Sequence, residues 1–125
     1  MSENKNVPEM TIEMEAKIYA ALEFRFGSTG QIIVAIEELA ELQQALTKYL
    51  RFLKVDSTGN LNDVRAHIRE EIADVNIMVT QMELMFGDTS DIQEAKLQRL
   101  YGLVADLFDE DGNRKPMHWW GGETE

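Results

Sequence analysis

Proline is confined to the two ends of the chain, at Pro8 and Pro116, so the long stretch between them lacks the residue that most strongly breaks helices. Within this stretch, apolar residues recur at intervals of three and four, as in amphipathic helices. No segment alternates convincingly between apolar and polar residues as a half-buried strand would. The sequence therefore predicts an all-α fold.

Turn and stop signals divide this stretch into four expected helices. Thr11 is a candidate N-cap for the first, and Gly27 is its expected stop. Ser90 or Asp91 is the expected N-cap of the last. The four helices span about residues 11–26, 30–54, 61–87 and 90–108. We expect them to pack as a four-helix bundle.

The length of 125 residues fits one domain over 1–125, with its core at about 11–108 and a short C-terminal tail. A hydrophobic content of 44% and a charged content of 28% are typical of a globular protein. Cysteine is absent, which excludes disulfides, thiolate metal sites and cysteine nucleophiles.

Charge and hydropathy narrow the expected partners and location. The formal net charge of −11 repels phosphate backbones and argues against DNA or RNA as a partner. No apolar run approaches the length of a membrane span, and the first ten residues do not resemble a signal peptide. We therefore expect no membrane partner and a cytoplasmic location.

Two acidic clusters occupy the second and third expected helices. Glu38 and Glu41 are three residues apart, and so are Glu71 and Asp74. Residues with this spacing are neighbours on a helix, where like charges repel by roughly 0.2–0.5 kcal/mol per pair. Each pair also borders apolar positions that another helix would cover. Because Mg²⁺ prefers oxygen ligands, two such clusters facing each other across a helical hairpin predict a metal site.

The paired motif, Glu37-Glu38-Leu39-Ala40-Glu41 followed after a hairpin-sized gap by Glu71-Ile72-Ala73-Asp74, resembles that of the all-α nucleoside triphosphate pyrophosphohydrolases. These form the MazG-like superfamily, which includes dimeric dUTPases and phosphoribosyl-ATP pyrophosphatases. The resemblance covers about residues 24–102. It implies hydrolysis between the α- and β-phosphates to a nucleoside monophosphate and pyrophosphate, with Mg²⁺ as cofactor and Mn²⁺ as a substitute.

The resemblance also assigns roles to individual residues. It implies that Glu38, Glu41, Glu71 and Asp74 are Mg²⁺ ligands, and that Glu37 helps to hold a catalytic water beside them. Four basic residues are candidates to meet the remaining phosphate charge: Lys48, Arg51, Lys96 and Arg99. Gln31, in the approach to the motif, is a candidate to line a nucleoside pocket. The preferred base stays open.

A single helical hairpin cannot enclose a nucleotide, and the apolar seams of the second and third helices are broad. The resemblance likewise implies pockets completed between subunits, so we expect a homodimer or a homotetramer. The seam of the second helix comprises Ile32, Ile36, Leu39, Leu46, Leu50 and Leu53, and that of the third Val64, Ile68, Ile72, Val75, Val79, Met82 and Phe86. Trp119 and Trp120 are expected to pack against the bundle or a neighbouring subunit, or else to stack on a base.

Other interpretations of the acidic residues stay open. His67 precedes Glu71 by one helical turn and is expected to pair with Glu71 or Glu70. The chain could instead be a non-catalytic acidic helical interaction module that binds a basic partner. A di-iron or di-manganese redox bundle is a further alternative, although its Glu-x-x-His signature is absent.

Overall fold

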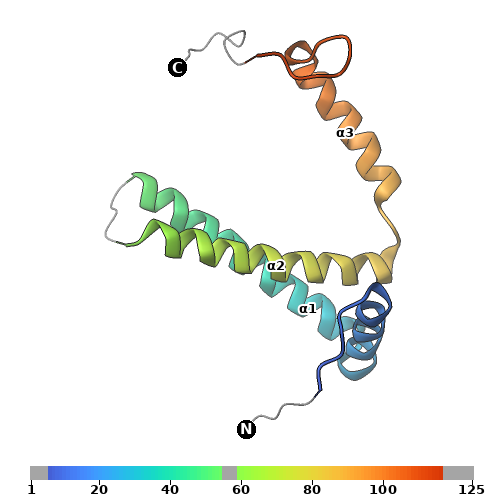
Figure 1. Ribbon diagram of the computed structural model, residues 1–125. Helices are drawn as coiled ribbons and strands as arrows, with labels where there is room; N and C mark the ends of the chain where they lie inside the picture. The colour runs from blue at the N-terminus through green and yellow to red at the C-terminus, as the bar shows by residue number, and fades with distance from the viewer. Residues whose placement is uncertain (1–5, 55–58, 117–125) are drawn as a thin grey trace. The chain divides into compact units, whose positions relative to one another are not determined.

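The computed structural model describes residues 6–54 and 59–116, so Trp119 and Trp120 lie outside the described residues. Three α-helices and a short 3₁₀ helix account for most of the described chain: α1 (Ile12–Lys54), α2 (Leu61–Phe86), α3 (Ser90–Val104) and η1 (Ala105–Leu107) (Figure 1). In these residues the only β-type pairing is an isolated bridge between Phe108 and Arg114. The predicted all-α fold is confirmed.

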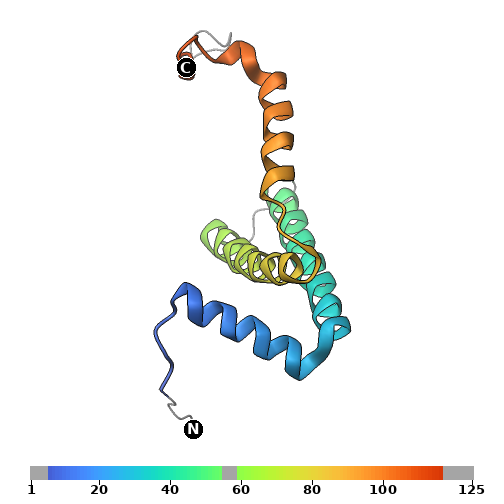
Figure 2. The same ribbon diagram turned by 90° about the vertical axis from the view of Figure 1, so that its right-hand side faces the viewer.

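Gly27 divides α1 into two helical segments of different direction. Its φ of +80° and ψ of 159° are non-helical, and a side chain is rarely found at such a φ. The N-terminal segment, residues 12–26, consequently leaves the axis of the long segment, residues 28–54 (Figure 2). Thr11 caps the N-terminal segment, because its Oγ1 accepts a hydrogen bond from the Met14 amide at 3.0 Å. The predicted cap and the predicted stop are both confirmed.

The structure also confirms the predicted span of α2. Asn60 precedes the helix, and its Oδ1 accepts hydrogen bonds from the amides of Asn62 at 2.8 Å and Asp63 at 3.4 Å. At the other end, Gly87 leaves the helical conformation with a φ of +120°, and its amide donates to the Glu83 carbonyl at 2.8 Å.

The chain divides into two compact units, Met1–Gly87 and Asp88–Glu125. The second unit holds α3 and η1, and in it the ring of Tyr101 lies 5.2 Å from that of Phe108. Thr89 occupies the N-cap position of α3, so the prediction of Ser90 or Asp91 there is wrong. The Asp88 side chain instead accepts hydrogen bonds from the amide and hydroxyl of Ser90, which holds Ser90 at the start of the helix. The single domain over residues 1–125 stays a prediction.

In the first unit, the long segment of α1 and α2 form an antiparallel helical hairpin (Figure 1). Among the described residues, its buried apolar side chains are Ala35, Ala45 and Met78. The two alanines allow the helix backbones to approach closely. The predicted seams form only part of this contact. Some of their residues are half-buried, whereas others are exposed, such as Leu50 at 59%. The half-buried seam residues are Ile32, Val64, Ile68, Val75 and Met82. The exposed seam residues lie beside the hairpin contact.

The hairpin has an apolar flank and an acidic flank. Each residue of an α-helix is rotated by about 100° from the one before it, which places the exposed seam residues and the acidic residues on different sides of the α1–α2 contact. The apolar flank consists of exposed large hydrophobic residues: Ile36, Leu39, Leu46, Leu50 and Leu53 on α1, with Ile72, Val79 and Phe86 on α2. The acidic flank consists of Glu37, Glu38 and Glu41 on α1, with Glu71 and Asp74 on α2.

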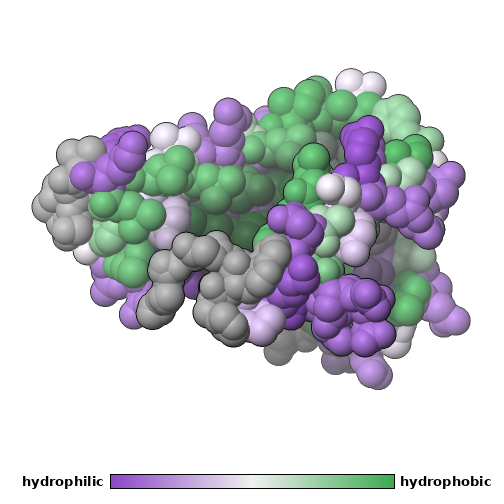
Figure 3. Space-filling model, turned by 90° about the horizontal axis from the view of Figure 1, so that it is seen from above, coloured by the Kyte–Doolittle hydropathy of each residue, from purple (hydrophilic) through white to green (hydrophobic). Residues whose placement is uncertain are grey.

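Apolar side chains gather in a band over the hairpin on the face shown in Figure 3. Leu46, Ile68 and Ile72 also line one hollow of about 320 Å³ between the two helices, which joins the two seams into one surface. None of the described helices is long and apolar enough to cross a membrane.

Candidate metal site on the hairpin

Three carboxylates from the two helices converge on the acidic flank. Glu38 on α1 and both Glu71 and Asp74 on α2 each offer one oxygen, and these oxygens all lie within 4.8 Å of one another. The two α2 residues are three positions apart and project together, while the antiparallel pairing brings Glu38 opposite them. The structure thus joins the two halves of the acidic motif, as the sequence predicted.

Burial makes the ionised form of these carboxylates unfavourable unless a hydrogen-bond donor or a cation is present. Glu71 is only 8% exposed, and Glu38 is half-buried. The Oε1 atoms of both glutamates are buried, and neither has a hydrogen-bond partner in the described part of the chain. A buried carboxylate oxygen that receives no hydrogen bond is normally protonated or bound to a cation. The three oxygens therefore form a donor set that fits a hard divalent cation.

The electrostatics of the two glutamates agree with this geometry. Loss of surrounding water is the largest cause that raises the pKa of Glu38 above 4.5, followed by the charges of Glu41, Asp74 and Glu71. Loss of water also raises the pKa of Glu71, and the charges of Glu41 and Asp74 add to it. Both carboxylates are thus destabilised in their ionised form, which a bound cation would relieve.

His67 provides a partial counter-charge. Its Nε2 lies 3.7 Å from Oε2 of Glu71 one turn later, so the predicted pairing with Glu71 is confirmed. This imidazole acts to lower the pKa of Glu71, but the pKa remains raised because desolvation and Glu41 outweigh it. Since the His67 side chain is 48% exposed, the contact is a surface ion pair of small energy.

The remaining acidic residues of the motif lie at the edge of the cluster. Glu41 is exposed and is not one of the three convergent residues, although its charge acts on both Glu38 and Glu71. Glu37 is exposed on the same flank of α1. Their roles as a fourth ligand and as a holder of water stay predictions.

The predicted phosphate-binding residues fall in two places. Lys48 and Arg51 are exposed and line a shallow hollow of about 480 Å³ made by α1 residues alone. Lys48 follows Glu41 by seven residues, or two turns, and shares its flank. Lys96 and Arg99 are exposed on α3, in the second unit. For all four residues, phosphate binding stays a prediction.

Gln31 is buried, and its role in a nucleoside pocket stays a prediction. It forms a hydrogen-bonded pair with Gln81, which was not predicted from the sequence. The Gln81 Nε2 donates to the Gln31 Oε1 at 2.8 Å, and both side chains are at most 5% exposed. The spacing could have revealed the pair, because Gln31 precedes Glu38 by seven residues and Gln81 follows Asp74 by seven. Seven residues are almost two turns, so each glutamine shares a face with its acid.

Comparison of the chain with protein-family models, with curated proteins and with solved structures found no match. The functional interpretation therefore depends on the geometry of this site and on the resemblance carried by the acidic motif.

Proposed function

We propose that this protein is a Mg²⁺-dependent nucleoside triphosphate pyrophosphohydrolase. It adds one water across the linkage between the α- and β-phosphates, which yields a nucleoside monophosphate and pyrophosphate. The observation that carries the proposal is the convergence of Glu38, Glu71 and Asp74 within 4.8 Å. Two of their buried carboxylate oxygens also have no hydrogen-bond partner within residues 6–54 and 59–116. The resemblance of the motif to the MazG-like superfamily supports the reaction class.

The chain's own residues have distinct roles in this proposal. Glu38, Glu71 and Asp74 hold Mg²⁺, for which Mn²⁺ can substitute. Glu41, three residues after Glu38, joins them as a fourth ligand. When bound, the ion supplies neutralisation of the phosphate charge and a lowered pKa for water. Glu37, exposed beside the cluster, orients the attacking water and accepts its proton.

Positive charge completes phosphate binding along the same flank. Lys48 lies two turns beyond Glu41, where its ammonium can meet the end of the triphosphate that points away from the Gln31–Gln81 pair. Arg51 lies one turn further along α1, and Lys96 and Arg99 on α3 provide further candidates. The net charge of −11 makes such local cations necessary for an anionic substrate.

The apolar flank supports a homo-oligomer, with a homodimer as the simplest form and a homotetramer as the next. Leu50 and Phe86 are 59% and 74% exposed, which is unfavourable for large apolar side chains that lie together on one face. A second copy of the chain can cover this flank with its own, because a two-fold axis brings identical surfaces together. The hairpins would then form a helical bundle between subunits.

The direct test is pyrophosphate release from a panel of nucleoside triphosphates in the presence of Mg²⁺. We expect activity in the wild-type protein and a loss of at least about 100-fold in Glu38→Gln and Glu71→Gln, because each removes a ligand charge. Glu70→Gln is the matched control, since it removes the same charge from the exposed neighbouring position on α2.

Circular dichroism should show that all three variants keep their helical content. Unchanged activity in both Glu38→Gln and Glu71→Gln would contradict the proposal. Absence of hydrolysis, together with tight binding of a basic protein or peptide that high salt abolishes, would favour the non-catalytic interaction module instead.

A further inference from the structure

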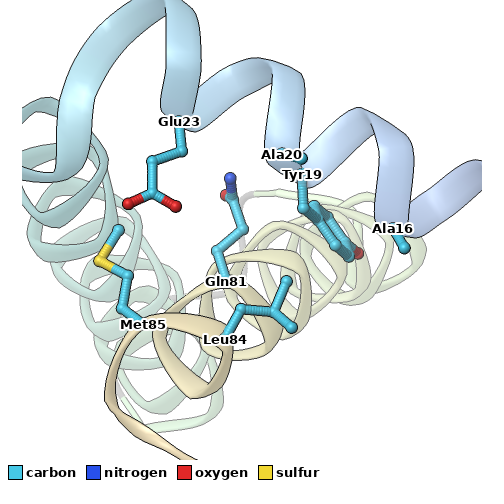
Figure 4. A pocket seen from close by; sticks show the side chains of 7 residues that line it. All are labelled: Ala16, Tyr19, Ala20, Glu23, Gln81, Leu84 and Met85. Atoms are coloured by element: carbon cyan, nitrogen blue, oxygen red, sulfur yellow. The ribbon is translucent and has the colours of Figure 1, made fainter.

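A cavity of about 240 Å³ lies between the N-terminal segment of α1 and the end of α2 (Figure 4). Its walls are mostly apolar, and a few polar groups face the same space, as is typical of small-molecule sites. The lining residues are Ala16, Tyr19, Ala20, Glu23, Gln81, Leu84 and Met85. All belong to the first compact unit, so the cavity is part of one folded body.

Gln81 lines this cavity and carries a buried acceptor without a partner in the described part of the chain. Its side chain is 3% exposed, and its Nε2 is used by the hydrogen bond to the Gln31 Oε1. Its Oε1 is buried and has no partner among the described residues. A buried amide oxygen needs a donor, and the Gln31 bond fixes the direction in which this oxygen points. An N–H or O–H group that reached this oxygen from the cavity would supply the missing donor.

Glu23 and Tyr19 complete the chemistry of the cavity. Glu23 Oε2 accepts a hydrogen bond from the Ser28 hydroxyl at 2.6 Å, which orients the carboxylate. Figure 4 shows this carboxylate and the Gln81 amide projecting toward the same space, so two acceptors lie together there. The Tyr19 ring and Leu84 add flat apolar surface, against which an aromatic ring can pack.

The cavity stands in register with the metal site. Gln81 follows Asp74 by seven residues on α2, so the two positions differ by only about 20° in rotation and by about 10 Å along the helix. The same spacing separates Gln31 from Glu38 on α1. The cavity and the acidic cluster therefore lie along the same side of α2.

We propose that this cavity binds the nucleobase of the substrate and selects bases with an exocyclic amino group. This inference rests on the proposed function, since it takes the triphosphate to lie at the acidic cluster. An amino group donates to the Gln81 Oε1 and the Glu23 carboxylate together, while the ring packs on Tyr19. An oxo group at the same place would confront two acceptors and could donate to neither.

Two pairs of substrates that differ only at this group provide the test. Cytidine is compared with uridine triphosphate, and adenosine with inosine triphosphate, by the kcat/KM for pyrophosphate release. Binding of the corresponding monophosphates without metal is measured by calorimetry. We expect a preference of about tenfold or more for the amino-bearing member of each pair in both measurements.

Variants connect the preference to these side chains. Glu23→Gln replaces one acceptor by an amide that can also donate, and should reduce the preference to within about threefold. Glu13→Gln is the matched control on the same helix segment, because Glu13 does not line the cavity, and should leave the preference unchanged. Tyr19→Ala should weaken the binding of all four nucleotides by about tenfold, whereas Tyr19→Phe should leave their binding unchanged.

The two proposals fail in different ways. Hydrolysis of all four triphosphates without a preference, or with a preference for the oxo member, would overturn the nucleobase assignment and leave the hydrolase standing. A tenfold preference among the monophosphates without hydrolysis would support the assignment and overturn the hydrolase. If no nucleotide is bound or hydrolysed, both are wrong.

Discussion

The two flanks of the α1–α2 hairpin are unstable for opposite reasons. The apolar flank exposes large side chains such as Leu50, which water solvates poorly, while the acidic flank holds Glu71 at 8% exposure, where an ionised carboxylate loses its water. In the proposals above, a second copy of the chain covers the apolar flank and a cation binds the acidic flank. A hairpin with so few buried apolar residues would then gain both stability and chemistry from what it binds.

The largest expected effect comes from placing a charge on the apolar flank. Leu50→Glu should weaken self-association by about 4 kcal/mol, roughly a thousandfold, because a hot-spot residue at a two-fold interface counts once in each subunit. Sedimentation velocity over a range of protein concentrations measures the change. Gln44→Glu adds the same charge to the outer face of the same helix and is the matched control.

Equal self-association of the wild type and Leu50→Glu would show that the apolar flank is not the interface. A monomeric wild-type protein would show that no second copy covers the apolar flank.

On the acidic flank, a metal should stabilise the fold. Mg²⁺ at about 100 times its Kd should raise the free energy of unfolding by about 2.7 kcal/mol through linkage. Thermal melting with and without Mg²⁺, at ionic strength matched with NaCl, measures the shift. Glu71→Gln should abolish it, Glu70→Gln should retain it, and Leu50→Glu should retain it because the flanks act separately. An equal shift with matched NaCl alone would mean that the cluster only responds to screening.

The sequence was sufficient for the features that depend on local chemistry. Thr11 and Gly27 marked the ends of the first helical segment because capping and positive φ are properties of single residues. The convergence of Glu38 with Glu71 followed from helical spacing and one hairpin. These predictions needed no knowledge of how the helix surfaces pack.

Features that depend on packing could not be predicted in the same way. The broad seam containing Leu50 was identified, but periodicity alone does not say whether a stripe meets the other half of the hairpin or another chain. The spacing of Gln81 from Asp74 indicates the face on which it lies, but its burial depends on contact with Gln31, 50 residues earlier in the chain. The N-cap of α3 was misplaced by one residue or more, since Asp88, Thr89, Ser90 and Asp91 are all residue types found at or near caps.

A change that belongs to neither flank tests whether the two are independent. Asn60→Ala removes the acceptor for the Asn62 and Asp63 amides at the start of α2 and should cost about 1 kcal/mol of stability. Chemical denaturation measures the loss. Asn62→Ala, at an exposed position one turn or less away, is the control. The metal-induced shift should remain the same size in Asn60→Ala; a smaller shift would mean that the cluster depends on the precise start of α2.

The smallest expected effect is a pH dependence of the metal-free protein. The folded pKa values of Glu38 and Glu71 are raised above 4.5, chiefly by loss of water. As the pH rises above 4.5, the unfolded chain releases these protons first, so the free energy of unfolding falls until the pH passes the folded pKa values. Solvent around the exposed Glu41 and Asp74 keeps the effect small.

Chemical denaturation at pH 5 and pH 7.5 measures this slope. The fall in the free energy of unfolding with pH should be smaller in Glu71→Gln, because this side chain has no proton to release. It should be unchanged in Glu70→Gln. Saturating Mg²⁺ should flatten or reverse the slope of the wild type, because the ion binds the deprotonated carboxylates and binds them better as the pH rises. The metal-free wild type and Glu71→Gln could instead show the same change in stability over this pH range. That result would mean that water already satisfies the buried oxygens of the acidic flank, without an ion.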